Sequence, residues 1–257
     1  MTRSVNKNVF VRGGATLSSE QGLNGLKADL GNSSDQSGVR SDGFSHLDTD
    51  EPLLAKTAKR IEQGLPGYSA EPVEGMTYHS WTGHNIDVID GRPILPDLGR
   101  DVKRPTTTGL GSCSFWGPNH AADSIVTRDG QDGSTQILLI QRGDTGDWAL
   151  PGGKLDQGET SSGAASRELS EETGLSVNFS EVNTAYKGYV NDPRNTQNAW
   201  FETTAIHAHL TGDAAQQEPK NGDDADDARW VTLTPEVLSN LYADHAKMVD
   251  AAMTSKT

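Results

Sequence analysis

Three glutamates stand within five residues near the middle of the chain, at Glu168, Glu171 and Glu172. Spacings of three and four residues place side chains on one face of a helix, where three carboxylates repel one another. Such a face is stable when a cation lies among the carboxylates. Hard divalent ions such as Mg²⁺ take oxygen ligands, bind through a few carboxylates and complete their shell with water and substrate phosphates. The spacing therefore predicts half of a metal site, and an acidic, solvated helix face is the alternative.

A helix is expected to carry these glutamates, from Glu159 to Thr173. Ala165 and Leu169 are four residues apart and form an apolar inner face. Gly174 follows the segment and predicts its end, because glycine adopts the left-handed conformation of a helix C-cap without strain. The helix would thus present the three carboxylates together.

The loop before this helix and one arginine within it complete the predicted metal site. Gly152 and Gly153 lack side chains, so the backbone can pass close to the ion, and the carbonyl group of Gly152 is a candidate further ligand. Arg167 stands four residues before Glu171, a spacing at which the two side chains can pair. A metal held here could polarise phosphoryl oxygens and activate a water molecule, which are the two requirements for hydrolysing a diphosphate.

Short apolar segments around this helix predict a sheet. The run QILLIQR, residues 136–142, is bounded by turn residues and predicts a buried strand. Further strands are expected in the segments TAYKGYV, AWFETTAIHAHL and ARWVTL. One amphipathic helix is expected from Pro235 onwards, with helical spacing of Leu238, Leu241, His245, Met248 and Val249. Strands and helices mix without a strict βαβ repeat, so the predicted fold class is α/β with a mixed sheet between helices.

Composition limits the kinds of partner. The chain has 257 residues, enough for one large domain or two modest ones, and a formal net charge of −14. An acidic chain does not suit a nucleic-acid backbone; it fits a protein that gathers divalent cations or has a solvated acidic surface. The single cysteine, Cys113, excludes an internal disulfide framework and favours a reducing compartment. A soluble protein is expected, because no apolar run approaches the ~18 residues of a membrane span.

Three regions are expected along the chain. Residues 1–51 are rich in Ser, Gly, Asn and Asp, which predicts a disordered leader, with a secretion or delivery leader as the alternative. Residues 52–114 contain Pro and Gly at short intervals, which predicts a small, loop-rich N-terminal subdomain. Residues 115–257 hold the regular pattern and are predicted to form the main domain.

The glutamate segment resembles the signature of the Nudix hydrolases. Gly153 is followed after five residues by Glu159 and, after seven more, by the run Arg167-Glu168-Leu169-Ser170-Glu171-Glu172-Thr173-Gly174-Leu175. The resemblance implies a Nudix α/β/α sandwich over residues 115–257 and hydrolysis of nucleoside diphosphates linked to another group. It also implies that Arg167 orients the acidic side chains and does not touch the substrate.

Other segments resemble one branch of that family, the ADP-ribose pyrophosphatases of the animal mitochondrial type and the related ADP-ribose-binding domain of melastatin-type channels. They are FWGPNHAADSIVTR, YKGYVNDPRNTQNAWFET, NGDDADDARWV and NLYADHAKMV. The resemblance implies that Asp192 and Arg194 contact the ribose and phosphates of ADP-ribose, a task suited to the planar fork of arginine. Tyr242 and His245, three apart on the final helix, would close over the terminal ribose. Without the resemblance, His245 is better interpreted as a core histidine.

Several further polar residues are candidates for the site. Asn119 and His120 are expected to shape a loop at the adenosine or metal side, which makes Asn119 a substrate-binding candidate, and Asp123 is an outer-shell candidate. Nudix enzymes draw their general base either from the helix glutamates or from an acidic residue on a distant loop. Asp223 and Asp224 are the loop candidates, Asp224 first, although a run of aspartates in a Gly-rich loop can also be merely solvated.

The expected function is Mg²⁺-dependent hydrolysis of ADP-ribose to AMP and ribose 5-phosphate, with Mn²⁺ as the alternative ion. A non-catalytic ADP-ribose sensor is one alternative. An enzyme acting on NADH, a nucleotide sugar or a dinucleoside polyphosphate is another. The expected partner is a small-molecule nucleotide, with no nucleic acid, membrane or protein partner, in the cytoplasm or, if the leader directs delivery, in a host cell.

Overall fold

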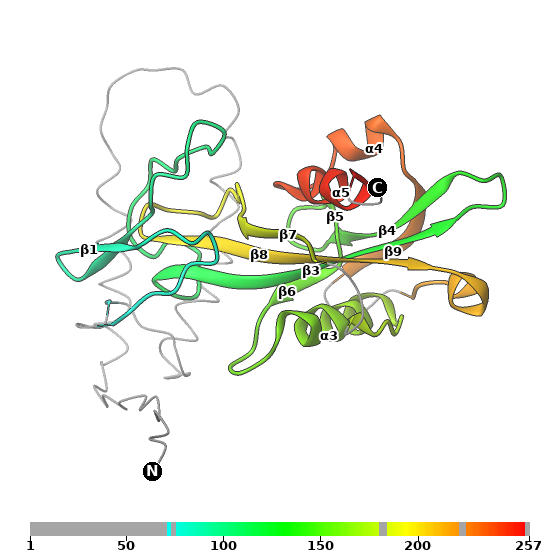
Figure 1. Cartoon of the computed structure of the whole chain (residues 1–257), viewed down its shortest axis with the longest axis horizontal. Coiled ribbons are helices and arrows are strands. Elements are labelled where there is room, and N and C mark those ends of the chain that lie inside the picture. The colour runs from blue at the N-terminus through cyan, green and yellow to red at the C-terminus, as the bar shows by residue number, and fades with distance from the viewer. Residues whose placement is uncertain (1–70, 73–75, 180–183, 221–224, 255–257) are drawn as a thin grey trace, which may run out of the picture.

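A seven-stranded sheet forms the centre of the part of the chain that the structure describes (Figure 1). The computed structural model describes residues 71–72, 76–179, 184–220 and 225–254. The strand order is β5-β4-β3-β8-β7, with β6 paired to β3 and β9 paired to β4. β3 and β8 run parallel and the other pairs run antiparallel, which confirms the predicted mixed sheet. The strands are β3 (Gly117–Asp129), β4 (Thr135–Arg142), β5 (Trp148–Ala149), β6 (Gly152–Lys154), β7 (Thr184–Tyr189), β8 (Ala199–Leu210) and β9 (Ala225–Thr232).

Helices cover both faces of this sheet. α3 (Ser161–Thr173) lies on one face, and α4 (Pro235–Ser239) and α5 (His245–Thr254) lie on the other (Figure 1). This arrangement is the predicted α/β/α sandwich. A short 3-10 helix, η3 (Gly212–Gln216), follows β8. Within the described ranges, every helix is too short or too polar to cross a membrane.

The described part of the N-terminal region is mostly loop with one hairpin. β1 (Asp87–Ile89) and β2 (Arg92–Ile94) pair antiparallel, apart from the large sheet. The N–H group of Leu95 donates to the carbonyl group of Gln197 at 2.8 Å, which ties this region to the loop before β8. The predicted leader, residues 1–51, and residues 52–70 lie outside the described residues. A subdomain boundary at residue 114 stays a prediction.

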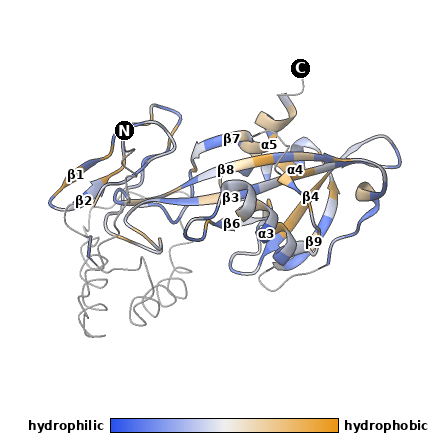
Figure 2. Ribbon diagram, turned by 60° about the horizontal axis from the view of Figure 1, so that its bottom comes forward, coloured by the Kyte–Doolittle hydropathy of each residue, from blue (hydrophilic) through white to orange (hydrophobic). Residues whose placement is uncertain are grey.

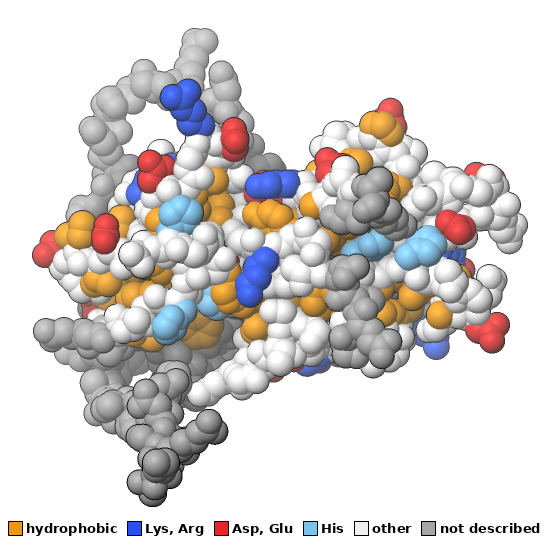
Figure 3. All heavy atoms as spheres, in the orientation of Figure 1, with side chains coloured by type: hydrophobic (Ala, Val, Ile, Leu, Met, Phe, Trp, Pro, Cys, Tyr) orange, Lys and Arg blue, Asp and Glu red, His pale blue; other side chains and the backbone are white. Residues whose placement is uncertain are grey.

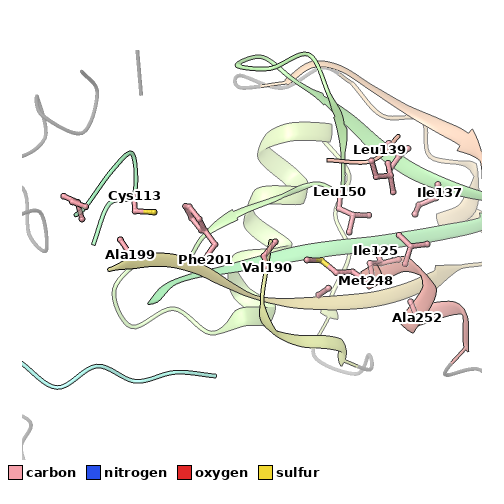
Figure 4. Close-up of a cluster of buried hydrophobic side chains, with 14 of the residues drawn as sticks. Cys113, Ile125, Ile137, Leu139, Leu150, Val190, Ala199, Phe201, Met248 and Ala252 are labelled. Atoms are coloured by element: carbon pink, nitrogen blue, oxygen red, sulfur yellow. The ribbon is translucent and has the colours of Figure 1, made fainter. Parts of the chain in front are cut away.

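Apolar side chains form a core on each side of the sheet, under each helix layer. The ribbon of Figure 2 has the colour of hydrophobic residues along β4 and part of β8. The α5 side buries Ile125, Ile137 and Met248, which lie close together in Figure 4. The α3 side buries the next residues along the two strands, Val126 and Leu138. Because helices cover both faces, β4 is a continuous apolar run with no polar alternation, as predicted for a buried strand.

α3 is fixed by a cap at each end. The side chain of Thr160 accepts a hydrogen bond from a backbone N–H group of the first turn, so the helix begins just after it and not at the predicted Glu159. Gly174 has a φ of 69° and ends the helix, as predicted. Ala165 and Leu169 are fully buried and confirm the predicted inner face. The opposite side of the helix is thereby left for the glutamates.

The prediction of one helix from Pro235 onwards is wrong. The chain forms α4, then a turn, then α5. Ala243 has a left-handed φ of 48°, and the N–H group of Tyr242 donates to the carbonyl group of Trp148 at 2.8 Å, which joins the turn to β5. The apolar spacing continues through this turn and concealed the break. Tyr242 therefore lies in the turn, and His245 is the first residue of α5.

Acidic side chains are spread over the surface of the described part. On the face shown in Figure 3, Asp and Glu side chains lie scattered, mostly near the outline, and basic side chains lie between them. Scattered carboxylates remain hydrated and repel each other weakly. A solvated acidic surface therefore accounts for the charge on this face, and the paired glutamates of α3 need a separate explanation.

Candidate active site

Two of the three glutamates of α3 converge on the glycine loop at β6. The N–H group of Gly152 donates to Oε2 of Glu172 at 2.9 Å, and Glu172 is buried. The carboxylate of Glu168 lies against Gly153, so that a Cβ atom on this glycine would collide with it. The glycine backbone thus lies against Glu168 and Glu172, while its approach to a metal ion stays a prediction. Glu171 lies farther out, with 57% of its side chain exposed.

Burial makes these carboxylates hard to ionise in the metal-free chain. It raises the pKa of Glu172 to about 8, and the negative charges of Glu168 and Asp123 add to the effect. Burial also raises the pKa of Glu168, even though Arg167 works in the opposite direction. Two neighbouring carboxyl groups with raised pKa values are typical of a functional site, and here a cation could complete it.

Arg167 holds the acidic cluster together. Its Nε and Nη2 atoms donate to both carboxylate oxygens of Glu159, at 3.0 and 2.9 Å. Its Nη1 atom donates to Glu168 at 2.8 Å and to Glu171 at 3.2 Å, which confirms the predicted pair with Glu171. Nη2 also donates to the carbonyl group of Lys154 at 3.1 Å, so the arginine ties α3 to β6. Glu159 accepts two of these hydrogen bonds and precedes the helix, so helical spacing could not predict this pair. Both residues belong to the family signature.

The side chains of this cluster fit a hard divalent ion as an incomplete ligand set. Among the described residues, no three His, Cys, Asp or Glu side chains are gathered closely enough to enclose a metal. The two converging carboxylates, Glu168 and Glu172, supply oxygen ligands of the kind that Mg²⁺ prefers. The remaining ligands would come from water, the backbone and the phosphates of a substrate. The carbonyl group of Gly152 as one of these ligands stays a prediction.

A cavity of about 150 Å³ opens beside the glycine loop, on the α5 side of the sheet. It joins Gly152 and Gly153 to four residues that the sequence analysis proposed as ligand contacts. These four are Asp192, Arg194, Tyr242 and His245. The rest of the lining is Ala121, Asp123, Ile140, Arg142, Leu150, Lys154, Val190, Phe201 and Thr203. A larger hollow of about 540 Å³ lies elsewhere, between β9 and α4, and neither glycine of the loop lines it.

Asp192 and Arg194 form a buried ion pair in this cavity. Nε and Nη2 of Arg194 donate to the two carboxylate oxygens of Asp192, at 2.8 and 2.7 Å. Burial opposes ionisation of Asp192, but the arginine outweighs it and holds the pKa of Asp192 below its ordinary value. The guanidinium group lies 4.2 Å over the ring of Phe201. Asp192 thus occupies the Nε and Nη2 edge of Arg194, and a contact of Arg194 with phosphate stays a prediction.

The remaining predicted ligand contacts surround this pair. The hydroxyl group of Tyr242 donates to Oδ2 of Asp192 at 3.3 Å, and Arg142 stacks 4.4 Å over the tyrosine ring. His245 accepts a hydrogen bond at Nδ1 from the N–H group of Leu150, at 2.9 Å. Its proton is therefore on Nε2, which lies 3.9 Å from Oδ1 of Asp123. Burial lowers the pKa of His245, so the ring is neutral.

Asp123 emerges as the link between this histidine and the glycine loop. It lies in β3, directly opposite Gly152, and its Oδ2 atom accepts a hydrogen bond from Thr203 at 2.6 Å. A Cβ atom on Gly152 would stand 2.5 Å from Oδ1 of Asp123, so the strand approaches the carboxylate as closely as a glycine allows. The alternation of β3 could have indicated that Asp123 faces the cavity, if the segment had been recognised as a strand.

Asn119 and His120 lie in β3, where the parallel pairing with β8 extends the strand. Asn119 is fully buried, and its amide group bonds to the backbone of Ser114, Phe115 and Gly117. It does not line the cavity, so it shapes the preceding loop and has no surface for a direct ligand contact. The loop candidates for the general base, Asp223 and Asp224, lie outside the described residues.

Comparison with known proteins identifies the family of the chain. A NUDIX domain profile matches residues 118–252, more than half of the chain. The chain belongs to the NUDIX family. The matched range begins at the start of β3 and ends within α5, so it includes the glycine loop, α3 and the cavity.

Two of the relatives have names that mention ADP-ribose, and a third is a cation channel. The mitochondrial ADP-ribose pyrophosphatase of Rattus norvegicus is 35% identical over 195 residues, covering 63% of this chain and 54% of the relative. The ADP-ribose pyrophosphatase of Methanocaldococcus jannaschii is 34% identical over 142 residues, covering 54% of this chain and 75% of the relative. A transient receptor potential cation channel, the subfamily M member-like 2 protein of Nematostella vectensis, is 36% identical over 203 residues, covering 64% of this chain but 12% of the channel. The chain thus spans only part of the length of several relatives.

Proposed function

We propose that this NUDIX protein hydrolyses ADP-ribose to AMP and ribose 5-phosphate with the help of Mg²⁺. The observation that carries the proposal is the position of the glycine loop between two groups of residues. Gly152 and Gly153 contact Glu172 and Glu168, and the same two glycines line the cavity that also contains the Asp192–Arg194 pair and Tyr242. A diphosphate flanked by two riboses needs both groups, a metal site for its phosphates and polar groups for its sugars. The names of the rat and Methanocaldococcus relatives support the same substrate.

The reaction adds one water molecule across the diphosphate. The water oxygen bonds to one phosphorus, the bond from that phosphorus to the bridging oxygen breaks, and the bridging oxygen leaves with the other phosphate. A bound Mg²⁺ ion would polarise the phosphoryl oxygens and lower the pKa of an attacking water molecule. Glu168 and Glu172 would hold this ion, and Arg167 keeps the carboxylate of Glu168 in place. The water proton would pass to a glutamate of α3 or to Asp224.

The groups on the α5 side would position the sugars and exclude water. Asp192, held by Arg194, keeps its negative charge and can accept hydrogen bonds from ribose hydroxyl groups. His245 presents an Nε2–H group towards the cavity because its Nδ1 atom is engaged by Leu150. Fixed polar groups of this kind need no reorganisation when the substrate binds.

A non-catalytic ADP-ribose sensor is the second candidate, because part of a cation channel is among the relatives. The glutamate cluster argues against it. A sensor gains nothing from two carboxylates whose pKa values are raised mainly by burial, whereas a metal-dependent hydrolase requires such ligands.

The test is a substrate panel with products resolved by chromatography. ADP-ribose, NADH, a nucleotide sugar and a dinucleoside polyphosphate are each incubated with the protein and Mg²⁺. We expect AMP and ribose 5-phosphate in equal amounts from ADP-ribose, with a higher kcat/KM than for the others. Binding of ADP-ribose without products would support the sensor. Turnover of NADH alone would keep the glutamate site and contradict the roles given to Arg194, Tyr242 and His245.

A further inference from the structure

The two segments that carry the α5-side residues of the cavity are joined by a contact outside it. Asn191 directly precedes Asp192, and Asp244 stands after Tyr242 and before His245. The backbone N–H group of Asn191 donates to Oδ2 of Asp244 at 2.9 Å, and its Nδ2 atom donates to Oδ1 and Oδ2 at 3.1 and 2.9 Å. Neither residue of this pair lines the cavity. The pair, called the brace below, therefore acts on the ligand-facing residues without touching a ligand itself.

The amide group of Asn191 can point in only one direction. Its Oδ1 atom accepts a hydrogen bond from the N–H group of Lys103 at 2.9 Å. The NH₂ end of the amide therefore faces Asp244, because the opposite orientation would set an oxygen against the carboxylate. Hydrogen bonds to a charged acceptor are stronger than those between neutral groups. The brace thus depends on an amide at position 191 opposite a carboxylate at position 244.

Inside the cavity, the same two segments are joined by a weaker contact. The hydroxyl group of Tyr242 donates to Oδ2 of Asp192 at 3.3 Å, whereas O–H···O hydrogen bonds usually measure about 2.5–3.0 Å. A ribose hydroxyl group bound to Asp192 would compete with this contact. The backbone N–H group of Tyr242 donates to Trp148, which fixes the turn to β5 and not to the loop of Asp192. The brace is then the polar contact that keeps Tyr242 at its distance from Asp192 when a ligand enters.

We propose that Asp244 is a positioning residue that acts through Asn191 to hold Tyr242 and His245 over the terminal ribose bound by Asp192. The inference rests on the proposed function and deepens it, because it names a residue that sets the affinity for this sugar. Without the brace, the turn before α5 would have to become ordered when the substrate binds. That cost is the same for the bound substrate and for the transition state, so it raises KM and leaves kcat nearly unchanged.

The experiment compares Asp244→Ala, Asn191→Asp and the double exchange Asn191→Asp/Asp244→Asn. Asp250→Asn is the control, because Asp250 is an exposed residue of α5 outside the cavity lining. Steady-state kinetics with ADP-ribose are combined with calorimetric titration of its α,β-methylene analogue and with thermal melting of each variant.

The two single variants should weaken binding and the double exchange should restore it. Asp244→Ala removes the acceptor, and Asn191→Asp sets two carboxylates against each other, so KM and the analogue Kd should rise about 10-fold with little change in kcat. In the double exchange, the amide at position 244 can accept from the backbone N–H group of residue 191 and donate to its carboxylate. Most of the binding should therefore return, and Asp250→Asn should match the wild type.

Inhibition by the two products separates positioning from a general loss of packing. Asp244→Ala should raise the inhibition constant of ribose 5-phosphate and leave that of AMP unchanged. Equal rises for both products would indicate that the whole domain has loosened and would overturn the inference. A wild-type KM and Kd in Asp244→Ala, or a double exchange that binds no better than Asn191→Asp alone, would also overturn it.

Failure of the hydrolase proposal would be recognised separately. If the wild type binds the analogue but releases no AMP from ADP-ribose, the hydrolase proposal fails, and the analogue Kd values of the variants still decide whether the brace positions the ligand. If the wild type releases AMP and the single variants keep its KM, the inference alone is overturned.

Discussion

Replacing Gly153 by alanine tests whether the glycine loop exists to admit a carboxylate. A Cβ atom on Gly153 would stand 2.5 Å from the carboxylate carbon of Glu168 and 2.8 Å from its Oε2 atom. Carbon atoms in contact lie about 3.5 Å apart, so the carboxylate must retreat by about 1 Å. The backbone of Gly153 does not have a positive φ, so alanine itself is tolerated there.

The expected effect is a loss of activity without a loss of the fold. A displacement of about 1 Å at a catalytic group costs about 100-fold in rate, so kcat for ADP-ribose should fall by about that factor. The hydrogen bond from Arg167 to Glu168 weakens, at a cost of about 1 kcal/mol, because the pair is partly exposed. Alanine recovers about 0.4–1 kcal/mol by restricting the unfolded chain, so the free energy of unfolding should change little.

The assay is AMP release at saturating Mg²⁺, run beside thermal melting. Gly163→Ala is the control, because Gly163 lies in the first part of α3 and a Cβ atom there meets no atom closer than 3.2 Å. This variant should keep its activity and gain stability from the higher helix propensity of alanine. Wild-type kcat in Gly153→Ala would refute the reasoning, because it would mean that the position of the Glu168 carboxylate does not matter.

Three further predictions follow from other contacts. Arg167→Met should lower the free energy of unfolding by about 2–3 kcal/mol, measured by urea titration, because it leaves Glu159 and Glu168 without their shared cation. Glu202 is fully buried and accepts hydrogen bonds from the Ser80 hydroxyl, the Trp81 backbone N–H and the Trp200 indole. Glu202→Gln should therefore lower the free energy of unfolding by about 2–4 kcal/mol. An unchanged urea midpoint would contradict this. Because the pKa of Glu172 is raised to about 8 from an unfolded value near 4.5, the metal-free chain should lose stability as pH rises between these values. Mg²⁺ competes with that proton, so its stabilising effect should grow from pH 6 to pH 8 and lose this dependence in Glu172→Gln.

The parts of the fold that depend on local chemistry were predictable from the sequence. The burial of residues 136–142, the inner face of α3 and the stop at Gly174 follow from apolar runs and from the conformations that glycine adopts. The acidic cluster was also predictable, because its members stand at fixed spacings within one helix and the loop before it.

Features that depend on pairing between distant segments were not predictable. The break between α4 and α5 arises because the turn at Tyr242 bonds to β5, about a hundred residues earlier, while the apolar spacing runs on unchanged. Strand β3 carries polar residues such as Asn119 and Asp123 on buried positions, so its first half does not read as an apolar strand in the sequence. The buried Glu202 likewise has partners more than a hundred residues away in the chain.

The pairing of Arg194 with Asp192 is a local contact that the sequence did not predict. The NDPRN motif indicated that both residues contact the ligand, but a separation of two residues does not reveal that the carboxylate accepts hydrogen bonds from the arginine.

The most direct test of the central claim is AMP formation from ADP-ribose by the wild type and by Glu172→Gln, each with Mg²⁺ and with a chelator. Glu218→Gln is the control, because Glu218 is an exposed partner of Arg128 far from the cavity lining. Turnover by the wild type that stops with the chelator and falls by at least about 100-fold in Glu172→Gln, but not in Glu218→Gln, is the predicted result. Wild-type turnover that survives in Glu172→Gln would contradict the account, because it would place the chemistry away from the buried glutamates of α3.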